Sequence, residues 1–278
     1  MRSWRLMDVF TEAVRNIAAS GTRAVMFGAA AALVVGALAY VELTTTADLL
    51  AFEDGFVTAG GNVVVATTDD GLDAARCAAL ASQRGVVSSV AVVTGPLVEV
   101  DQAPGTLFNT ASVTVGALDQ FVLGSSLSSA DTVDRWVVGA SAAQELGVGE
   151  GMWLGVDGGE SRQVGVIIDT EVRNPRMQRW IMTVVPAAGT ADECWVEFAP
   201  GARAGREEFV ATIFADSADV VVAPWIRLDQ FSRNSVAELA ARPQADGWLI
   251  AGLVLAGISW LATWFRRSQI GLYRAVGT

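Results

Sequence analysis

Two long runs without a charged residue most constrain how this chain can fold. Residues 24–41 and 247–265 consist almost entirely of apolar side chains. At about 1.5 Å per helical residue, each run forms a helix that spans close to the roughly 30 Å hydrocarbon core of a membrane. The sequence therefore predicts two transmembrane helices. They separate the end segments 1–23 and 266–278 from one large intervening segment, residues 42–246.

A cleaved signal peptide is the alternative interpretation of the first run. Residues 1–23 precede the run, the run is long, and the following YVELTTTAD offers no clear A-x-A cleavage site. These features favour a helix that stays in the membrane.

The arginines that flank the two runs predict the orientation of the chain. Basic residues accumulate on the cytoplasmic side of membrane helices, so both termini are expected in the cytoplasm. Every acid except Asp8 and Glu12 then lies in residues 42–246, which places most of the negative charge in one extracytoplasmic domain of a plasma-membrane protein with a net charge of −11. The flanking arginines are Arg2, Arg5, Arg15, Arg23, Arg266, Arg267 and Arg274.

The types of residue that are missing exclude several kinds of catalysis. The chain has no histidine, and all 19 of its basic residues are arginines. This removes the P-loop lysine, the Ser-His, Cys-His and Ser-Lys arrangements, and histidine-based metal sites. Asp69–Asp70 and Glu207–Glu208 are adjacent pairs that a strand or helix would point in different directions, which favours surface acids over a two-carboxylate hydrolase. We expect no catalytic residues, cofactor or metal.

Cys77 and Cys194 both lie in the segment predicted to be extracytoplasmic, where oxidising conditions permit a disulfide. Their spacing has no CxxC pattern and says little about metal. The sequence is compatible both with a Cys77–Cys194 disulfide and with two buried free thiols.

Two features of the membrane segments suggest contacts beyond simple anchoring. Apolar residues recur every three or four positions within residues 1–23, which predicts an amphipathic helix on the cytoplasmic membrane surface. Small residues recur in both apolar runs and would allow close approach of another helix. The amphipathic positions are Met7, Phe10, Val14 and Ile17, and the helix-packing positions are Gly28, Ala32, Gly36, Gly252 and Ala256.

The extracytoplasmic segment reads as a mixed α/β domain, so the predicted fold class is an α+β membrane protein. Residues 62–93 and 194–223 each have the pattern strand, helix, strand, with Asp69 or Asp70 as the expected cap of the first helix. We interpret them as two related β-α-β units. Residues 96–190 have short alternating runs and glycine turns, typical of an inserted β-rich subdomain.

Two further segments of this domain have distinctive patterns, one rich in arginine and one helical. Thr170–Trp180 contains three arginines. This pattern is typical of a solvated hairpin tip, and it is also compatible with a contact site for an anionic partner. The stretch after Ile226 has a helical pattern, with Phe231 and Leu239 among its apolar positions, until Pro243 breaks or kinks it. It predicts a stalk that leads into the second membrane helix.

The closing segment RRSQIGLYRAVGT closely resembles the segment after the second membrane helix in ABC transporter permeases of the MacB/FtsX type. Two other stretches are also similar to that family: AVRNIAASGTR before the first span, and residues 137–167 in the periplasmic core domain. The matching positions at the C-terminus are Arg266, Arg267, Ile270, Gly271, Leu272, Arg274, Ala275 and Gly277.

The resemblance implies a non-catalytic permease subunit that couples a cytoplasmic ATPase partner to a periplasmic-core-type domain, for export or for mechanotransmission. It also implies a homodimer or a pairing with another permease. A transported substrate could be a peptide, a small antibiotic or a lipid-linked molecule, or nothing could be transported. The positions expected to dock on the ATPase are Arg266, Arg267, Ile270, Gly271, Leu272, Arg274 and Gly277.

The sequence also departs from the family pattern. Gln269 stands where an acid is usual, and the family has four membrane helices where this sequence predicts two, as in the N-terminal half of such a permease. The competing hypothesis is a two-span anchored sensor or binding protein without an ATPase partner. An adjacent gene for an ATPase would separate the two, and nothing in the sequence points to nucleic acid.

Overall fold

The computed structural model describes residues 11, 21–121, 132, 134–156, 160–202, 204–226, 235–242 and 246–275. The chain divides into two compact units, which we call the helical unit (Met1–Ala51 with Ser235–Thr278) and the sheet domain (Phe52–Asn234). The predicted amphipathic helix of residues 1–23 lies almost wholly outside the described residues.

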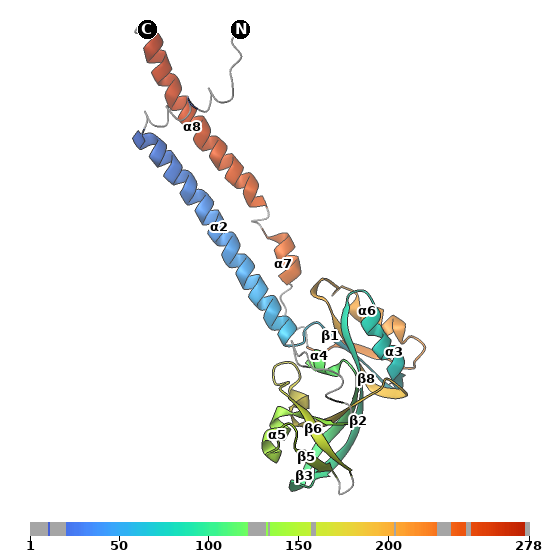
Figure 1. Cartoon of the computed structure of the whole chain (residues 1–278). Helices are drawn as coiled ribbons and strands as arrows, with labels where there is room; N and C mark the ends of the chain where they lie inside the picture. Colours follow the sequence, from blue (N-terminus) through green and yellow to red (C-terminus); the bar gives the residue numbers. More distant parts are fainter. Residues whose placement is uncertain are drawn as a thin grey trace. The chain divides into compact units, whose positions relative to one another are not determined.

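The helical unit contains α2 (Gly21–Thr58), α7 (Ser235–Ala241) and α8 (Gly247–Ala275), and α2 continues into the sheet domain (Figure 1). Among the described residues, one helix is long and apolar enough to cross a membrane, over Val25–Thr58. The apolar part of α8, Gly247–Leu261, is shorter, so a second transmembrane helix stays a prediction. The predicted stalk corresponds in part to α7, while its apolar position Phe231 lies outside the described residues.

Helix α2 extends 17 residues beyond the end of the apolar run at residue 41. The threonines that follow the run are compatible with a helix because their hydroxyls bond to the backbone one turn earlier. Thr44 Oγ1 donates to the carbonyl of Tyr40 (3.0 Å), and Thr45 Oγ1 donates to the carbonyl of Val41 (2.8 Å). The end of the apolar run is therefore not the end of the helix.

Both predicted strand–helix–strand units are present in the sheet domain, and their strands interleave. β8 pairs with β1 and β2, and β1 also pairs with β9, all antiparallel. Helices α3 and α6 lie on one side of these four strands (Figure 1). The units are β1 (Val63–Asp73), α3 (Ala74–Ala79), η1 (Leu80–Ser82) and β2 (Val86–Val100), and β8 (Thr190–Phe198), η4 (Pro200–Ala202), α6 (Arg206–Ile213) and β9 (Val221–Pro224).

The expected helix cap at Asp69 or Asp70 is wrong. Both residues lie within β1, which continues through an irregularity at Gly71, whose φ is +81°. The cap is Asp73, whose side chain accepts hydrogen bonds from the backbone N–H groups of Ala75 and Arg76 at 2.9 and 3.0 Å. A glycine in the left-handed region permits this kink without a steric penalty.

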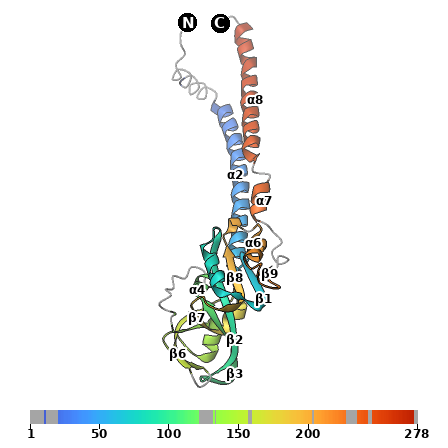
Figure 2. The same cartoon turned by 90° about the vertical axis from the view of Figure 1, so that its right-hand side faces the viewer.

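The predicted β-rich insertion is part of the same nine-stranded sheet rather than a separate subdomain. β3 pairs with both β7 and β2, and β2 pairs with β5, so six strands close into a ring in the order β2-β3-β7-β4-β6-β5. The long strand β2 belongs to both the ring and the four-stranded part (Figure 2). The elements are β3 (Ala103–Thr114), α4 (Ala117–Phe121), β4 (Trp136–Gly139), α5 (Ala140–Leu146), β5 (Trp153–Val156), β6 (Glu160–Ile168), η3 (Pro175–Arg179) and β7 (Trp180–Val185).

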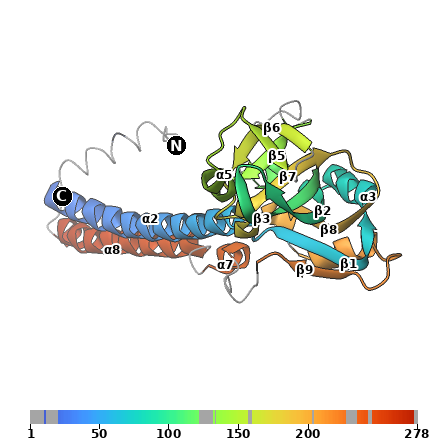
Figure 3. The ribbon, with the colours of Figure 1, turned by 90° about the horizontal axis from the view of Figure 1, so that it is seen from below.

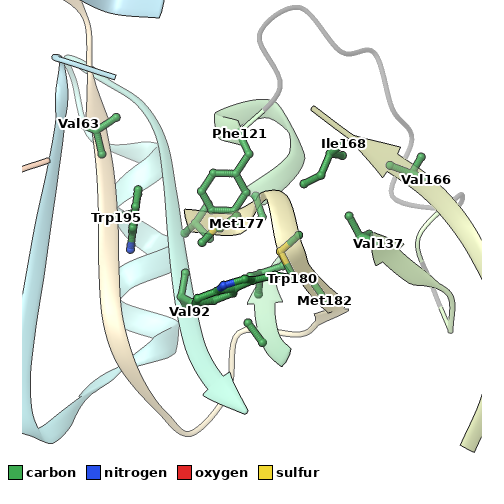
Figure 4. Close-up of a cluster of buried hydrophobic side chains, with 14 residues drawn as sticks. Val63, Val92, Phe121, Val137, Val166, Ile168, Met177, Trp180, Met182 and Trp195 are labelled. Atoms are coloured by element: carbon green, nitrogen blue, oxygen red, sulfur yellow. The ribbon is translucent and has the colours of Figure 1, made fainter. Parts of the chain in front are cut away.

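The core is divided by the sheet. On the helix-covered side, Cys77 of α3 and Cys194 of β8 form a disulfide within an apolar cluster that includes Val210 of α6 and Phe214, the residue after α6. On the opposite side, Phe121, Met177 and Trp180 pack with Trp195 of β8 and with Val137 and Val166 of the ring strands (Figure 4). This second cluster joins the four-stranded part to the ring.

Candidate functional site: the junction of helix α2 with the sheet

The C-terminal end of α2 is packed tightly against the turn that leads into β1. Phe56, in the last turns of the helix, is 5% exposed. A Cβ atom on Gly61 would lie 2.3 Å from the Phe56 ring, so only glycine allows the backbone to pass this close. Gly60, with φ at +84°, lies beside Trp225, which follows β9. The helix end is thereby fixed within the sheet domain.

Arg173 connects the end of α2 to β8. Its side chain is buried, and its Nη1 donates to the carbonyl of Val57 in the last turn of α2 (3.1 Å). Its Nη2 lies 2.6 Å from Glu197 Oε1 on β8, and both side chains of this ion pair are about 5% exposed. One guanidinium therefore satisfies a helix-terminal carbonyl and neutralises a buried carboxylate.

Asn62 and Ser88 also donate hydrogen bonds to the Glu197 carboxylate. Asn62 Nδ2 donates to its Oε1 (3.0 Å) and also to the carbonyl of Phe198 (2.9 Å). Ser88 Oγ of β2 donates to its Oε2 (3.1 Å). The carboxylate thus joins β8, β2 and the turn before β1, and it has the partners that make a buried charge tolerable.

A second buried arginine holds the same turn. Arg206, the first residue of α6, donates through Nη1 to the carbonyl of Gly61 (2.9 Å) and lies 3.2 Å from Glu207 through Nε. Trp225 Nε1 donates to the carbonyl of Arg173 (2.9 Å), which fixes the backbone that carries the first arginine. The turn between α2 and β1 is therefore tied to α6 as well as to β8.

The arginine-rich loop Thr170–Trp180 is not a solvated hairpin tip. Glu193, Trp195 and Glu197 alternate along β8 and so share one face of the strand. Arg173 pairs with Glu197, and Arg176 makes a two-pronged contact with Glu193 at 3.2 and 2.8 Å. The third arginine, Arg179, pairs with Glu145 of α5 at 2.8 Å. Each arginine of the loop thus has a carboxylate partner inside the sheet domain, which argues against a contact site for an anionic partner.

Three tryptophans surround the Arg176 guanidinium. Its carbon lies 5.1 Å from the ring centroid of Trp180 and 5.7 Å from those of Trp195 and Trp225. Trp195 Nε1 also donates to Glu193 Oε2 (2.7 Å). Cation–π contacts of this kind add to the ion pair and hold the loop against β8.

Asp169 at the start of the loop also has a defined environment. The N–H of Glu171 and the side chain of Gln178 donate to its carboxylate, and these bonds lower the pKa of Asp169 below its usual value. Because hydrogen bonds to the charged form favour that form, Asp169 stays ionised at neutral pH.

Except for Gly277, the residues predicted to dock on an ATPase lie in the C-terminal part of α8. The helix runs through Gly271 to Ala275, so Gly271 occupies a helical position rather than a turn. The side chains of Arg266, Arg267, Ile270, Leu272 and Arg274, and all of Gly277, lie outside the described residues.

The predicted helix-packing residues are exposed in this chain. Gly28, Ala32 and Gly36 of α2 and Gly252 and Ala256 of α8 all face away from described neighbours, and a Cβ atom added to any of the three glycines of this set would meet nothing within 4 Å. These faces therefore do not mediate contact between α2 and α8, and their role in packing against other helices stays a prediction.

Sequence reasoning missed the four residues that hold the junction, namely Arg173, Glu197, Asn62 and Arg206. Arg173 and Glu197 are 24 positions apart, and Asn62 is 135 positions from Glu197. One signal was present, because Glu197 interrupts the apolar run at the start of the strand–helix–strand unit predicted for residues 194–223. A charged residue at such a position needs a partner.

The comparisons with known proteins yield a distant likeness in fold. No family model matches the chain, and no curated protein matches it. The chain is similar to the periplasmic region of MacB from Actinobacillus actinomycetemcomitans, with 12% identity, a TM-score of 0.46, and coverage of 64% of this chain and 94% of that one.

Two other solved structures give similar values. A domain of a protein described as a permease from Porphyromonas gingivalis has 14% identity, a TM-score of 0.43, and coverage of 63% of this chain and 97% of that one. The extracellular domain of the ABC-type transporter YknZ from Gram-positive bacteria has 13% identity, a TM-score of 0.39, and coverage of 58% and 100%. At these identities the likeness concerns the fold alone.

Proposed function

We propose that this chain is a non-catalytic permease subunit of an ABC transporter, or the N-terminal part of one. In this role it couples a cytoplasmic ATPase to an extracytoplasmic sheet domain, for export or for transmission of force. The proposal draws its family from the resemblance of RRSQIGLYRAVGT to the MacB/FtsX-type segment that follows the second membrane helix. It includes a second membrane helix formed by α8 and a pairing with another permease chain.

The observation that carries the proposal is the continuity of α2 into the sheet domain. The helix has 38 residues and is therefore about 57 Å long, whereas about 20 residues suffice to cross a bilayer. The 17 residues after position 41 form the helical connection, and Arg173 binds the carbonyl of Val57 at its end. A helix held in this way transmits displacement, while a Gly/Ser tether would absorb it.

The C-terminal end of α8 supplies the proposed contact with the ATPase. The apolar side chains Ile270 and Leu272 would enter a groove of the partner, and Arg266, Arg267 and Arg274 would pair with its acids. Because Gly271 has no side chain, it permits close approach of the partner backbone to the helix.

Replacing Gly271 by Trp is expected to abolish association with the ATPase. The test uses the longer protein that carries the remaining helices, together with the Walker-motif protein that copurifies with the unsubstituted chain. Co-purification and stimulated ATP hydrolysis are the two readouts. The matched control is Gln269→Trp, which places the same tryptophan side chain about 200° around the same helix and should leave association unchanged. Normal association and stimulation in the Gly271→Trp variant would instead favour an anchored sensor without an ATPase.

Both termini are expected in the cytoplasm because seven arginines flank the two apolar runs on that side. Reporter fusions at residues 2 and 278 should be active only as cytoplasmic reporters, and a fusion within the exposed turn at Asp101–Gln102 should be active only outside. Extracytoplasmic activity at either terminus would contradict the topology and the permease proposal with it.

A further inference from the structure

Two charged residues join α2 to the segment that precedes α8 in the helical unit. Glu42 is the first charged residue after the apolar run of α2, and Arg242 follows the last residue of α7. Arg242 Nη1 lies 3.0 Å from Glu42 Oε1 and 3.5 Å from Thr46 Oγ1. Glu42 and Thr46 are four positions apart and share one face of α2, so a single guanidinium spans two successive turns.

The environment of this pair differs from that of a solvated surface pair. The Glu42 and Arg242 side chains are 36% and 26% exposed. Glu42 Oε2 and Arg242 Nε are covered from solvent and have no hydrogen-bond partner among the described residues. If one partner were removed, the half-exposed charge of the other would stay partly desolvated without its counter-ion.

The small residues of α2 and α8 do not hold these two helices together in the described part of the chain. The two helices run alongside each other (Figures 2 and 3), yet the small residues that could let them approach closely are exposed. A Cβ atom at Gly28, Gly36, Gly252 or Gly257 would meet nothing within 4 Å. The half-buried positions of α2 are instead apolar ones such as Val34 and Leu38, so the contact of Glu42 with Arg242 adds a specific polar interaction to them.

We propose that Glu42 and Arg242 are positioning residues that fix the end of α7, and so the segment that leads to α8, against α2 at the outer boundary of the membrane. Their ion pair holds this segment at one turn of α2, and it leaves the small-residue faces of α2 and α8 free for other helices. The location at the membrane boundary rests on the proposed function, whereas the contact itself does not.

Chemical cross-linking of the full chain in membranes tests this proposal. Cysteines are introduced at Thr45 and Ala241, which neighbour the contacting residues, and are joined by a short flexible bismaleimide. The native cysteines are bonded to each other and do not compete for the reagent. We expect rapid cross-linking in the otherwise unchanged chain, and an initial rate several-fold lower with Glu42→Gln or with Arg242→Gln. The exchanged pair, Glu42→Arg with Arg242→Glu, should restore most of the rate.

The matched control is Glu145→Gln, which removes a carboxylate from the exposed pair with Arg179 in the sheet domain and should leave the rate unchanged. Three results would overturn the proposal: no cross-linking in the unchanged chain, equal rates in the single variants, or an exchanged pair as slow as the single variants. Since the readout is helix proximity, it is independent of ATPase association, and failure of the permease proposal would be seen only in the Gly271→Trp experiment.

Discussion

Replacing Arg173 by Met is expected to lower the free energy of unfolding of the sheet domain by about 3 kcal/mol, because it leaves Glu197 buried without its opposite charge. The substitution also removes the donor to the carbonyl of Val57 at the end of α2. Methionine keeps much of the buried volume, so the loss reports mainly on charge and hydrogen bonding. Urea unfolding of the full chain in detergent, followed by tryptophan fluorescence, measures the change.

The matched control is Arg179→Met, in the same loop. The Arg179–Glu145 pair has side chains that are 57% and 39% exposed, and exposed pairs of this kind contribute about 0–1 kcal/mol. The two variants should therefore unfold at clearly different urea concentrations. Equal unfolding midpoints for both variants would show that the buried pair does not hold the junction.

Removing the disulfide by Cys77→Ala with Cys194→Ala is expected to lower the free energy of unfolding by about 2–5 kcal/mol. The bond links residues 117 positions apart, so it removes many conformations from the unfolded chain. Both sulfur-bearing residues are fully buried and alanine is smaller than cysteine, so a modest packing loss adds to the effect. The same urea experiment applies, with the chain expressed into an oxidising compartment.

A reductant supplies the control for this second prediction. Because the bond is inaccessible in the folded domain, a mild reductant should leave the unsubstituted chain unchanged in the absence of urea, and should shift its unfolding midpoint toward that of the double variant in urea. A double variant that unfolds at the same urea concentration as the unsubstituted chain would mean that the bond adds nothing to stability.

Local pattern predicted much of the sheet domain. Apolar runs on either side of a helical stretch predicted both strand–helix–strand units. These features depend on the spacing of apolar residues over short stretches of sequence. The cap at Asp73 was missed because two other aspartates precede it and a glycine kink keeps them within β1.

Such local patterns do not predict which distant strands pair with each other. The sequence predicted an inserted subdomain at residues 96–190, but the pairing of β3 with both β2 and β7 merges it with the rest of the sheet. The choice between free thiols and a bond at Cys77 and Cys194 also depended on which strand lies beside α3. Neither question can be answered from neighbours in sequence, because strand order depends on the packing of the whole sheet.

By itself, the sequence determined the properties that depend on composition and on local order. These are the two uncharged apolar runs, the arginines beside them, the lack of histidine and lysine, and the alternation of strands and helices. Only the tertiary structure decided that α2 continues to Thr58 and that its end is held by Arg173 and Glu197. The physical reason is that a buried charge selects its partner by proximity in the folded chain. For the same reason, only the structure shows that Glu42 and Arg242, which are 200 positions apart, form an ion pair.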